Sequence, residues 1–247
     1  MELEERVAVV TGGCSGIGRA ICVELARRGC DVAFVDITAG PPAESLRQEI
    51  ADLGCRSLFY EADVADFALA QECAVTVMRE LGHIDFLVNN AGTHADSVVW
   101  KMSEEQWDRV IDVNLKGAFN YLRAFAPIMR ERRSGVIVNI SSLAAIRGRF
   151  GLANYSAAKA GLMGMTRSVA KEMGKYNVRV NVIAPGYVQT SMMEKLPPEY
   201  KEQAMSETVL NRLGLPDDVA NVVCFLCSDR ARHITGEIIR VDGGQHL

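Results

Sequence analysis

Residues 6–18 read Arg6-Val7-Ala8-Val9-Val10-Thr11-Gly12-Gly13-Cys14-Ser15-Gly16-Ile17-Gly18. The apolar run that opens this stretch is typical of a parallel strand buried on both faces. It ends in a glycine-rich turn, and an amphipathic helical pattern follows to about Arg28. A strand, a tight turn and a helix in this order form the repeating unit of doubly wound α/β sheets. This stretch therefore predicts the class of the fold.

The turn and the next strand predict a dinucleotide site. Glycines at a strand-to-helix turn let the backbone approach a pyrophosphate, whose negative charge is favoured at the helix N-terminus. The second predicted strand, residues 31–36, ends in Asp36, which lies 18 residues beyond Gly18. A carboxylate at about this distance meets the hydroxyls of the adenosine ribose. A purely structural turn is the alternative, but the acidic strand end favours dinucleotide binding.

Strands and helices alternate along the rest of the chain. Further apolar runs predict strands at residues 56–60, 84–88, 136–140, 178–183 and 237–241. Helical patterns lie at 41–53, 67–81 and 104–132, around Tyr155, and from Pro216 onward. We therefore expect a single-domain α/β Rossmann fold over residues 1–247, with a doubly wound, seven-stranded parallel sheet and helices on both faces. Residues 191–213 are polar and rich in methionine, and we expect a helical excursion that covers the substrate.

Composition excludes several classes of partner. The 247 residues carry a formal net charge of -4, which leaves no broad basic surface for nucleic acid. No apolar run reaches the ~18 residues that a membrane span needs. The acidic N-terminus leads directly into a strand, so we expect no signal peptide. The seven cysteines are scattered through apolar patterns, as in proteins of a reducing compartment, and we expect a cytoplasmic protein.

Cys224 and Cys227 have the spacing of a redox or metal-binding pair. No second pair and no neighbouring histidine completes such a site. We therefore interpret both cysteines as core residues and expect no metal site.

Tyr155 and Lys159 are four residues apart in a helical pattern, so their side chains lie on one face of the helix. A free tyrosine has a pKa of about 10 and exchanges protons poorly near neutrality. A lysine ammonium held nearby favours the phenolate and lowers that pKa toward the range of a general acid. Taken alone, the pair also fits an ordinary buried helix with one tyrosine and one surface lysine.

Six features, in the same order along essentially the whole chain, resemble the short-chain dehydrogenase/reductase family. This resemblance implies an oxidoreductase that transfers a hydride between a nicotinamide cofactor and a carbonyl or secondary alcohol. The features are Thr11-Gly12-x-x-x-Gly16-Ile17-Gly18, Asn89-Asn90-Ala91-Gly92, Asn114, Ser142, Tyr155-x-x-x-Lys159 and Pro185-Gly186.

The resemblance also implies a role for each of four catalytic residues. Tyr155 would pass a proton to or from the substrate oxygen, and Ser142 would hydrogen-bond that oxygen. Lys159 would hold the nicotinamide ribose and lower the pKa of Tyr155, while Asn114 would anchor a water that leads to Lys159. A strand-end cap for Ser142 and a polar interruption of an apolar helix for Asn114 are the alternatives. The implied cofactor-binding residues are Gly12, Ser15, Gly16, Ile17, Gly18, Asp36, Ile37, Asp63, Val64, Asn90, Ala91, Gly92, Tyr155, Lys159, Pro185, Gly186, Val188 and Thr190.

Within the family, the chain is most similar to reductases of 3-oxoacyl thioesters, which include 3-oxoacyl-acyl-carrier-protein reductases and acetoacetyl-CoA reductases. The similar phrases lie at residues 101–107, 151–161, 225–228 and 241–246. Many relatives with alcohol or sugar substrates share them, so a dehydrogenase of a small alcohol, a polyol or a hydroxysteroid stays open. A catalytically silent dinucleotide-binding sensor or scaffold is the alternative from another class, and the complete catalytic set disfavours it.

One departure from the thioester reductases bears on the cofactor. Those relatives usually prefer NADPH and carry a basic residue just before the central glycine or just after the second strand. Here these positions hold Ser15 and Ile37, and Asp36 is acidic. A carboxylate accepts hydrogen bonds from the free ribose hydroxyls of NAD and repels the 2′-phosphate of NADP. We therefore expect NAD as the cofactor, with NADH preferred over NADPH.

The resemblance implies a homotetramer as well. Its subunits would pair across a two-fold axis through the long helix around Trp107 to Met129 and the Tyr155 helix. The final strand with its neighbouring helix would form the second contact. Small side chains on the Tyr155 helix would allow close approach at the first of these contacts. They are Ala157, Ala158, Ala160, Gly161 and Gly164.

A local basic cluster suggests how a thioester carrier could be recognised. It consists of Arg130, Arg132 and Arg133, and we expect Arg147 and Arg149 to join it. These arginines could meet the phosphates of CoA or an acidic acyl carrier protein. A solvated helix end, where cations suit the helix dipole, is the alternative.

Overall fold

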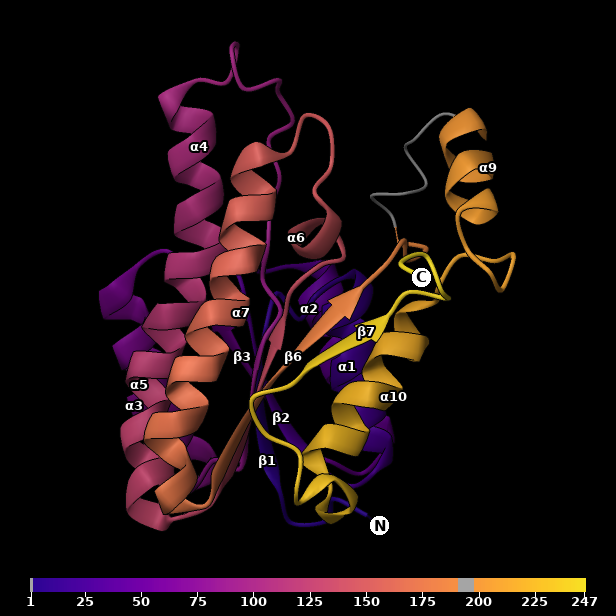
Figure 1. Cartoon of the computed structure of the whole chain (residues 1–247). Helices are drawn as coiled ribbons and strands as arrows, with labels where there is room; N and C mark the ends of the chain where they lie inside the picture. The colour runs from indigo at the N-terminus through magenta and orange to yellow at the C-terminus, as the bar shows by residue number, and fades with distance from the viewer. Residues whose placement is uncertain (1, 191–197) are drawn as a thin grey trace.

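A seven-stranded parallel sheet forms the centre of the protein (Figure 1). The computed structural model describes residues 2–190 and 198–247. The strand order is β3-β2-β1-β4-β5-β6-β7, and every neighbouring pair is parallel. This arrangement confirms the predicted sheet. The strands are β1 (Val7–Thr11), β2 (Asp31–Asp36), β3 (Ser57–Glu61), β4 (Phe86–Asn89), β5 (Gly135–Ile140), β6 (Val178–Pro185) and β7 (Ile238–Val241).

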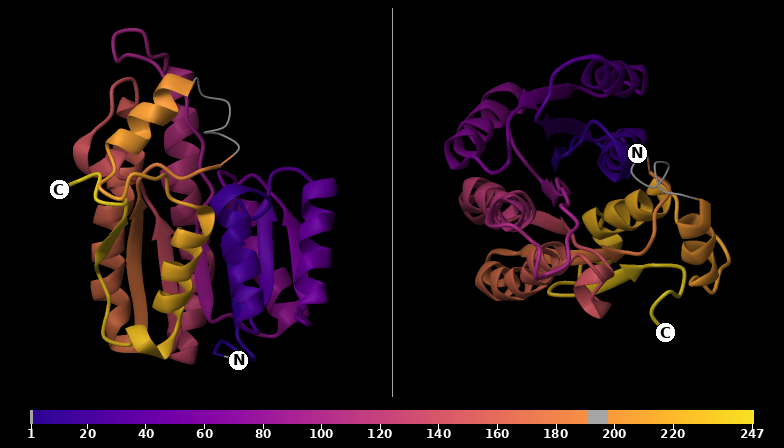
Figure 2. Two further views of the ribbon diagram at one scale, coloured as in Figure 1. Left: turned by 90° about the vertical axis from the view of Figure 1, so that its right-hand side faces the viewer. Right: turned by 90° about the horizontal axis from the view of Figure 1, so that it is seen from above.

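Helices cover both faces of this sheet (Figure 2). On one face, α1 (Gly16–Arg27), α2 (Pro41–Asp52) and α10 (Pro216–Cys227) bury their apolar stripes. On the other, α3 (Phe67–Leu81), α5 (Gly117–Arg132) and α7 (Ala153–Met173) do the same. Because neither face meets water, a strand can be apolar at every position, and all of β1 is buried.

The chain reverses its course across the sheet between β1 and β4. From β1 it builds outward through β2 to β3, and it then returns to the other side of β1 as β4. At such a switch point the loops at the carboxyl edge diverge and leave a crevice, where open α/β sheets bind their ligands. The glycine turn follows β1, and the Asn89-Asn90-Ala91-Gly92 motif begins at the end of β4. Two predicted motifs therefore meet at this crevice.

A chain of buried amides fixes α7 against the centre of the sheet. Asn89 Nδ2 donates to Asn139 Oδ1 over 2.8 Å, and Asn139 Nδ2 donates to Thr166 Oγ1 over 2.8 Å. Asn139 and Thr166 are fully buried, so any slip in the register of β4, β5 or α7 would leave polar groups without partners, which is costly. The helix that carries Tyr155 is therefore held in one position.

The helix predicted over residues 104–132 contains an interruption that the sequence did not indicate. It begins as α4 (Glu104–Ile111), passes through a π-helical turn, η1 (Asp112–Lys116), and continues as α5. Ser103 and Gln106 cap its start with reciprocal hydrogen bonds. Wide turns of this kind are frequent at functional sites, and Asn114 lies in the middle of this one.

Several shorter helices complete the fold. The predicted excursion at 191–213 contains α9 (Pro198–Ser206), which stands apart from the sheet in Figure 1; its residues 191–197 lie outside the described part of the chain. The sequence did not predict α6 (Ala144–Arg147) or the 3-10 turns η2 (Gly174–Tyr176) and η3 (Asp229–Ala231). Within the described ranges, no helix combines the length and apolar character needed to cross a membrane.

Cys224 and Cys227 lie in the core, as predicted. Both thiols are buried between α10 and the sheet. Burial raises the pKa of Cys224 to about 12 and that of Cys227 well above its ordinary value. Such thiols are protonated at neutral pH and are therefore poor nucleophiles.

Candidate active site

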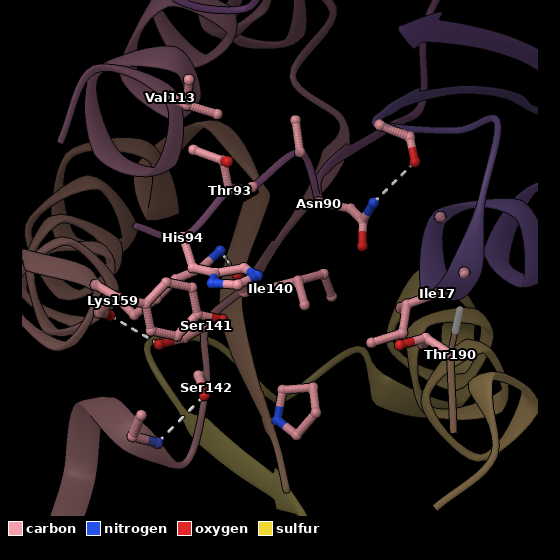
Figure 3. Close-up of a pocket in the computed structure, with 18 of the residues that line it drawn as sticks. Ile17, Asn90, Thr93, His94, Val113, Ile140, Ser141, Ser142, Lys159 and Thr190 are labelled. Carbon is pink, nitrogen blue, oxygen red and sulfur yellow. Dashed lines mark hydrogen bonds between the residues drawn. The ribbon is translucent and has the colours of Figure 1, made fainter. Parts of the chain in front are cut away.

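A cavity of about 500 Å³ opens at the carboxyl edge of the sheet. Figure 3 shows Ile17 and Thr190 on one side of it, with His94, Ser142 and Lys159 on the other. Every residue predicted to hold the cofactor lines this cavity, and so does Ser142. Asn114 lies behind Gly92 instead. The fold thus gathers residues from the whole length of the chain around one space.

Glycines give the turn after β1 its tight shape. Gly12 and Gly16 have φ values of +65° and +52°, which favour glycine. A Cβ at Gly18 would lie 2.0 Å from the carbonyl oxygen of Gly12. Ser15 does not cap α1 with its side chain, so the first N–H groups of the helix remain available to an anion. Gly12, Gly16 and Gly18 therefore form a hollow, the glycine cradle, which larger residues would fill. This hollow fits the pyrophosphate of a dinucleotide.

The Asp36 carboxylate stands beside this cradle at the end of β2. Its Oδ2 accepts a 2.9 Å hydrogen bond from the N–H of Cys14, and its Oδ1 accepts one of 2.9 Å from the N–H of Ile37. These backbone donors fix the carboxylate, and each oxygen keeps a lone pair for a further donor. Asp36 therefore offers acceptors where the adenosine ribose of a dinucleotide would lie.

Asp63 has a partner that the sequence did not indicate. Arg109 Nη1 donates to Asp63 Oδ2 over 2.9 Å, and both residues line the cavity. Burial raises the pKa of Asp63, but the bonds from Arg109 and from the N–H of Ala65 outweigh it and hold the pKa below its ordinary value. This ion pair ties α4 to the end of the cavity that contains Asp36.

Asn114 holds the segment that follows Gly92. Its Nδ2 donates to the carbonyl oxygens of Thr93 (2.7 Å) and Val110 (3.0 Å), and its Oδ1 accepts from the N–H of Thr93 (3.0 Å). A Cβ at Gly92 would lie 2.6 Å from Asn114 Oδ1 and 3.3 Å from Lys159 Nζ. Asn114 and Lys159, from two different elements, therefore both lie close to Gly92.

Tyr155 and Ser142 meet inside the cavity. Burial raises the pKa of Tyr155 above its ordinary value of 10, while the neighbouring Ser142 hydroxyl and the positive charge of Arg149 lower it in part. Asn154 fixes the start of this helix, since its buried amide donates to the carbonyl oxygens of Ala95 and Gln106. The resulting group is a protonated phenol beside a second hydroxyl.

Lys159 is not among the groups that lower the pKa of Tyr155, so the lowering by its ammonium stays a prediction. The Lys159 ammonium lies 5.8 Å from the centroid of the Tyr155 ring, and its Nζ donates to the carbonyl oxygen of Ile140 over 2.8 Å. Burial dominates instead and lowers the pKa of Lys159 itself to about 8. Ser141 Oγ donates to the Lys159 carbonyl oxygen over 2.7 Å, which joins α7 to the end of β5.

Sequence reasoning missed a histidine in this cavity. His94 Nδ1 and Asp96 Oδ1 are 2.6 Å apart, and both residues line the space opposite the glycine turn. The place of His94 two residues after Gly92 could have suggested it.

Tyr187 and two arginines form a further part of the lining. The guanidinium carbons of Arg147 and Arg149 lie 5.9 Å and 5.1 Å from the centroid of the Tyr187 ring. The N–H of Tyr187 donates to Gln245 Oε1 over 2.8 Å, so residues near the C-terminus support this wall. All four residues line the cavity.

The expected single basic cluster is divided between two ends of the molecule. Arg132 Nη1 donates to the carbonyl oxygen of Ile84, just before β4, while Arg130 and Arg133 lie over the Tyr176 ring. These contacts are at the amino edge of the sheet. Arg147 and Arg149 lie at the carboxyl edge instead. The strand β5 separates the two groups in the sequence and runs from the amino edge of the sheet to the carboxyl edge. Within one chain they cannot act as one patch.

The fold and the site define a class of oxidoreductase. Residues 12–246 match a family model described as enoyl-(acyl carrier protein) reductase. The chain belongs to the short-chain dehydrogenase/reductase family, whose members use nicotinamide cofactors.

Individual relatives are similar over nearly their whole length. The chain is 43% identical to a 3-oxoacyl-[acyl-carrier-protein] reductase FabG of Thermotoga maritima, over 99% of both chains. It is 42% identical to the protein of that name from Staphylococcus aureus, over 97% of this chain and 98% of the relative. A putative short-chain alcohol dehydrogenase from Sinorhizobium meliloti has a similar structure, with a TM-score of 0.95 and 36% identity over 99% of this chain and 97% of that one.

Proposed function

We propose that this protein reduces a 3-oxoacyl thioester to the 3-hydroxyacyl form with NADH. The observation that carries the proposal is the Tyr155 hydroxyl paired with Ser142 in a cavity that begins at a glycine cradle. Two hydroxyl groups that line one cavity suit a carbonyl oxygen, which takes up a proton, better than a carbon–carbon double bond. The names of the FabG relatives support the thioester and an acyl carrier protein as its carrier.

The residues act on the oxygen of the substrate. Tyr155 gives its proton to the developing oxyanion, and Ser142 stabilises the same oxygen with a hydrogen bond. When bound, the nicotinamide supplies the hydride that reaches the carbonyl carbon. Lys159 holds the ribose, and Asn114 fixes the Gly92 segment behind Lys159. Helix α9, in the excursion at 191–213, covers the substrate. Residues 1–247 form a single dinucleotide-binding and catalytic domain.

Burial keeps the pKa of Tyr155 above its ordinary value, so the phenol carries the proton that the reduction of a ketone takes up. The same group accepts a proton in the reverse reaction, so an NAD-dependent dehydrogenase of a small alcohol, polyol or hydroxysteroid is the second candidate. The substrate assay below distinguishes the two.

Replacement of Tyr155 by Phe tests the function. The change removes one hydroxyl, so folding and nucleotide binding are expected to survive while kcat falls by about 10²–10⁴. The assay compares a 3-oxoacyl thioester, an enoyl thioester and small alcohols as substrates. Tyr176→Phe, at the amino edge of the sheet, is the matched control and should retain full activity. Turnover by the Tyr155 variant within a few-fold of wild type would contradict the assignment.

The preference for NADH follows from Asp36. Its fixed carboxylate would lie against the extra phosphate of NADPH, and like charges at close range cost several kcal/mol. Ser15 and Ile37 supply no positive charge in return. We expect a specificity constant at least about a hundredfold higher with NADH, since each 1.4 kcal/mol is a factor of ten.

Asp36→Ala combined with Ile37→Arg should erode or reverse this preference. Specificity constants of both proteins with both cofactors provide the measurement. A wild-type protein that uses NADPH better than NADH would show that Asp36 does not meet the ribose.

A further inference from the structure

The cavity has a positively charged region away from the glycine cradle. Arg147 and Arg149 come from the short segment between β5 and α7, and both line the cavity beside Tyr187. The sequence suggested a role for both in meeting the carrier, but neither takes part in the proposed proton transfer. Their surroundings differ, and this difference decides which of them is free to bind a ligand.

Arg147 already has an anionic partner. Its Nη2 donates to Glu207 Oε2 over 2.7 Å, and each of the two side chains is 29% exposed. This ion pair joins α6 to the segment that follows α9. The charge of Arg147 is therefore neutralised within the chain.

Arg149 has no such partner among residues 2–190 and 198–247. The contact that its guanidinium makes there is with the Tyr187 ring, at 5.1 Å from the ring centroid. A ring contact orients a guanidinium but leaves its N–H donors free. Its charge also reaches the Tyr155 hydroxyl strongly enough to lower the pKa of that group in part. An uncompensated guanidinium thus lies near the catalytic acid.

We propose that Arg149 binds a carboxylate of the substrate, so that the site also reduces free 3-oxo carboxylates. The planar guanidinium presents paired donors that match the two oxygens of a carboxylate. In a 3-oxo acid the carboxylate is separated from the ketone by a single methylene group. Arg149, Tyr155 and Ser142 line one cavity, so a ketone oxygen held by the two hydroxyls leaves the carboxylate in the space that Arg149 also lines. This inference rests on the proposed function only in that Tyr155 is the acid.

The reaction is balanced in the same way as that of the thioester. The ketone carbon gains a hydride from the reduced nicotinamide, its oxygen gains the proton of Tyr155, and the product is a 3-hydroxy carboxylate. The nicotinamide is oxidised, Tyr155 recovers a proton from solvent, and the carboxylate itself is unchanged.

A pair of substrates with one skeleton tests the proposal. 3-Oxobutanoate carries the carboxylate, and ethyl 3-oxobutanoate replaces it with an uncharged ester. In Arg149→Gln, kcat/KM for the carboxylate should fall about 10- to 100-fold, the range expected for one charge-assisted interaction. The value for the ester should change far less. Arg149→Lys, which keeps the charge but loses the paired donors, should lie between wild type and Arg149→Gln for the carboxylate.

A binding measurement separates recognition from turnover. 3-Oxobutanoate is titrated calorimetrically into protein saturated with NAD⁺, which cannot reduce the ketone. The Kd should rise about 10- to 100-fold in Arg149→Gln. It should stay unchanged in Arg79→Gln, a control on the exposed face of α3.

The outcomes distinguish this inference from the proposed function. A wild-type protein that reduces the thioester but neither binds nor reduces 3-oxobutanoate overturns the role of Arg149 and leaves the function intact. Equal losses on carboxylate and ester in Arg149→Gln also overturn it. Absence of thioester reduction, together with carboxylate binding that depends on Arg149, contradicts the proposed function and supports the inference.

Discussion

Lys159 carries an ammonium group into an enclosed position between Gly92 and β5. Burial lowers its pKa from 10.5 to about 8, so the folded protein holds a charged lysine at neutral pH at a cost on the order of 3 kcal/mol. The hydrogen bond from its Nζ to Ile140 offsets about 1 kcal/mol of this. We therefore predict that Lys159→Met raises the free energy of unfolding at pH 7 by about 2 kcal/mol, although it abolishes turnover.

The extra free energy of unfolding of Lys159→Met over the wild type should shrink as the pH rises. Between about pH 8 and 10.5 the unfolded lysine is protonated and the folded one is not. The unfolded state then binds more protons, so wild-type stability rises with pH across this window relative to the variant. Denaturant titrations of both proteins without nucleotide provide the measurement. A difference that does not shrink from pH 7 to pH 10 would contradict the assigned cause.

The position of a functional side chain could be predicted where a sequence motif fixes the backbone around it. Asp36 stands beside the glycine turn as predicted, because the distance from Gly18 to the end of the next strand follows from one helix and one loop. The pKa of Tyr155 could not be predicted in this way. It depends on how deeply α7 docks and on Arg149, which a loop brings near.

At the scale of elements, the π-helical turn η1 sets the position of Asn114 behind Gly92. We predict that Gly92→Ala lowers kcat/KM by about 10²-fold, because its Cβ would displace Asn114 or Lys159 and small displacements of catalytic groups cost about this much. Gly174→Ala is the matched control, since nothing lies within 4 Å of a Cβ there. Steady-state kinetics of both variants provide the test. Normal activity in Gly92→Ala would show that the contact across this glycine is unimportant.

Most elements could be predicted from apolar periodicity, and α3 matches its predicted bounds, residues 67–81. The π-turn could not, because one wide turn barely changes the spacing of apolar residues such as Val110, Val113 and Leu122. The short helix α6 was missed for a different reason. Four residues between two motifs are too few to show a period.

At the scale of the whole molecule, α7 presents a stripe of small exposed residues at Ala157, Ala160 and Gly164. Ala158 and Gly161, which the sequence also suggested for a subunit contact, pack inside the chain. We propose that the stripe meets its copy in a homotetramer. Light scattering should therefore report four chains of 27.0 kDa for the wild type.

Gly164→Trp should reduce that mass without unfolding the chain, because nothing within the chain lies within 4 Å of a Cβ there. Ala51→Trp, at an exposed site on α2, is the control and should leave the mass unchanged. A wild-type monomer at micromolar concentration would contradict the proposed assembly.

The bond between Gln245 and Tyr187 has a consequence for synthesis on the ribosome. The strands β1 to β4, which surround the glycine cradle, are contiguous in the sheet and precede β5 to β7 in the sequence, so they are translated earlier. Gln245, which supports the Tyr187 wall, follows β7 in the sequence and is translated later. A nascent chain therefore forms the part of the cavity with the glycine cradle and Asp36 before Tyr187 and Gln245 exist. Nucleotide could bind to and stabilise the growing chain at a stage when it is still unable to turn over.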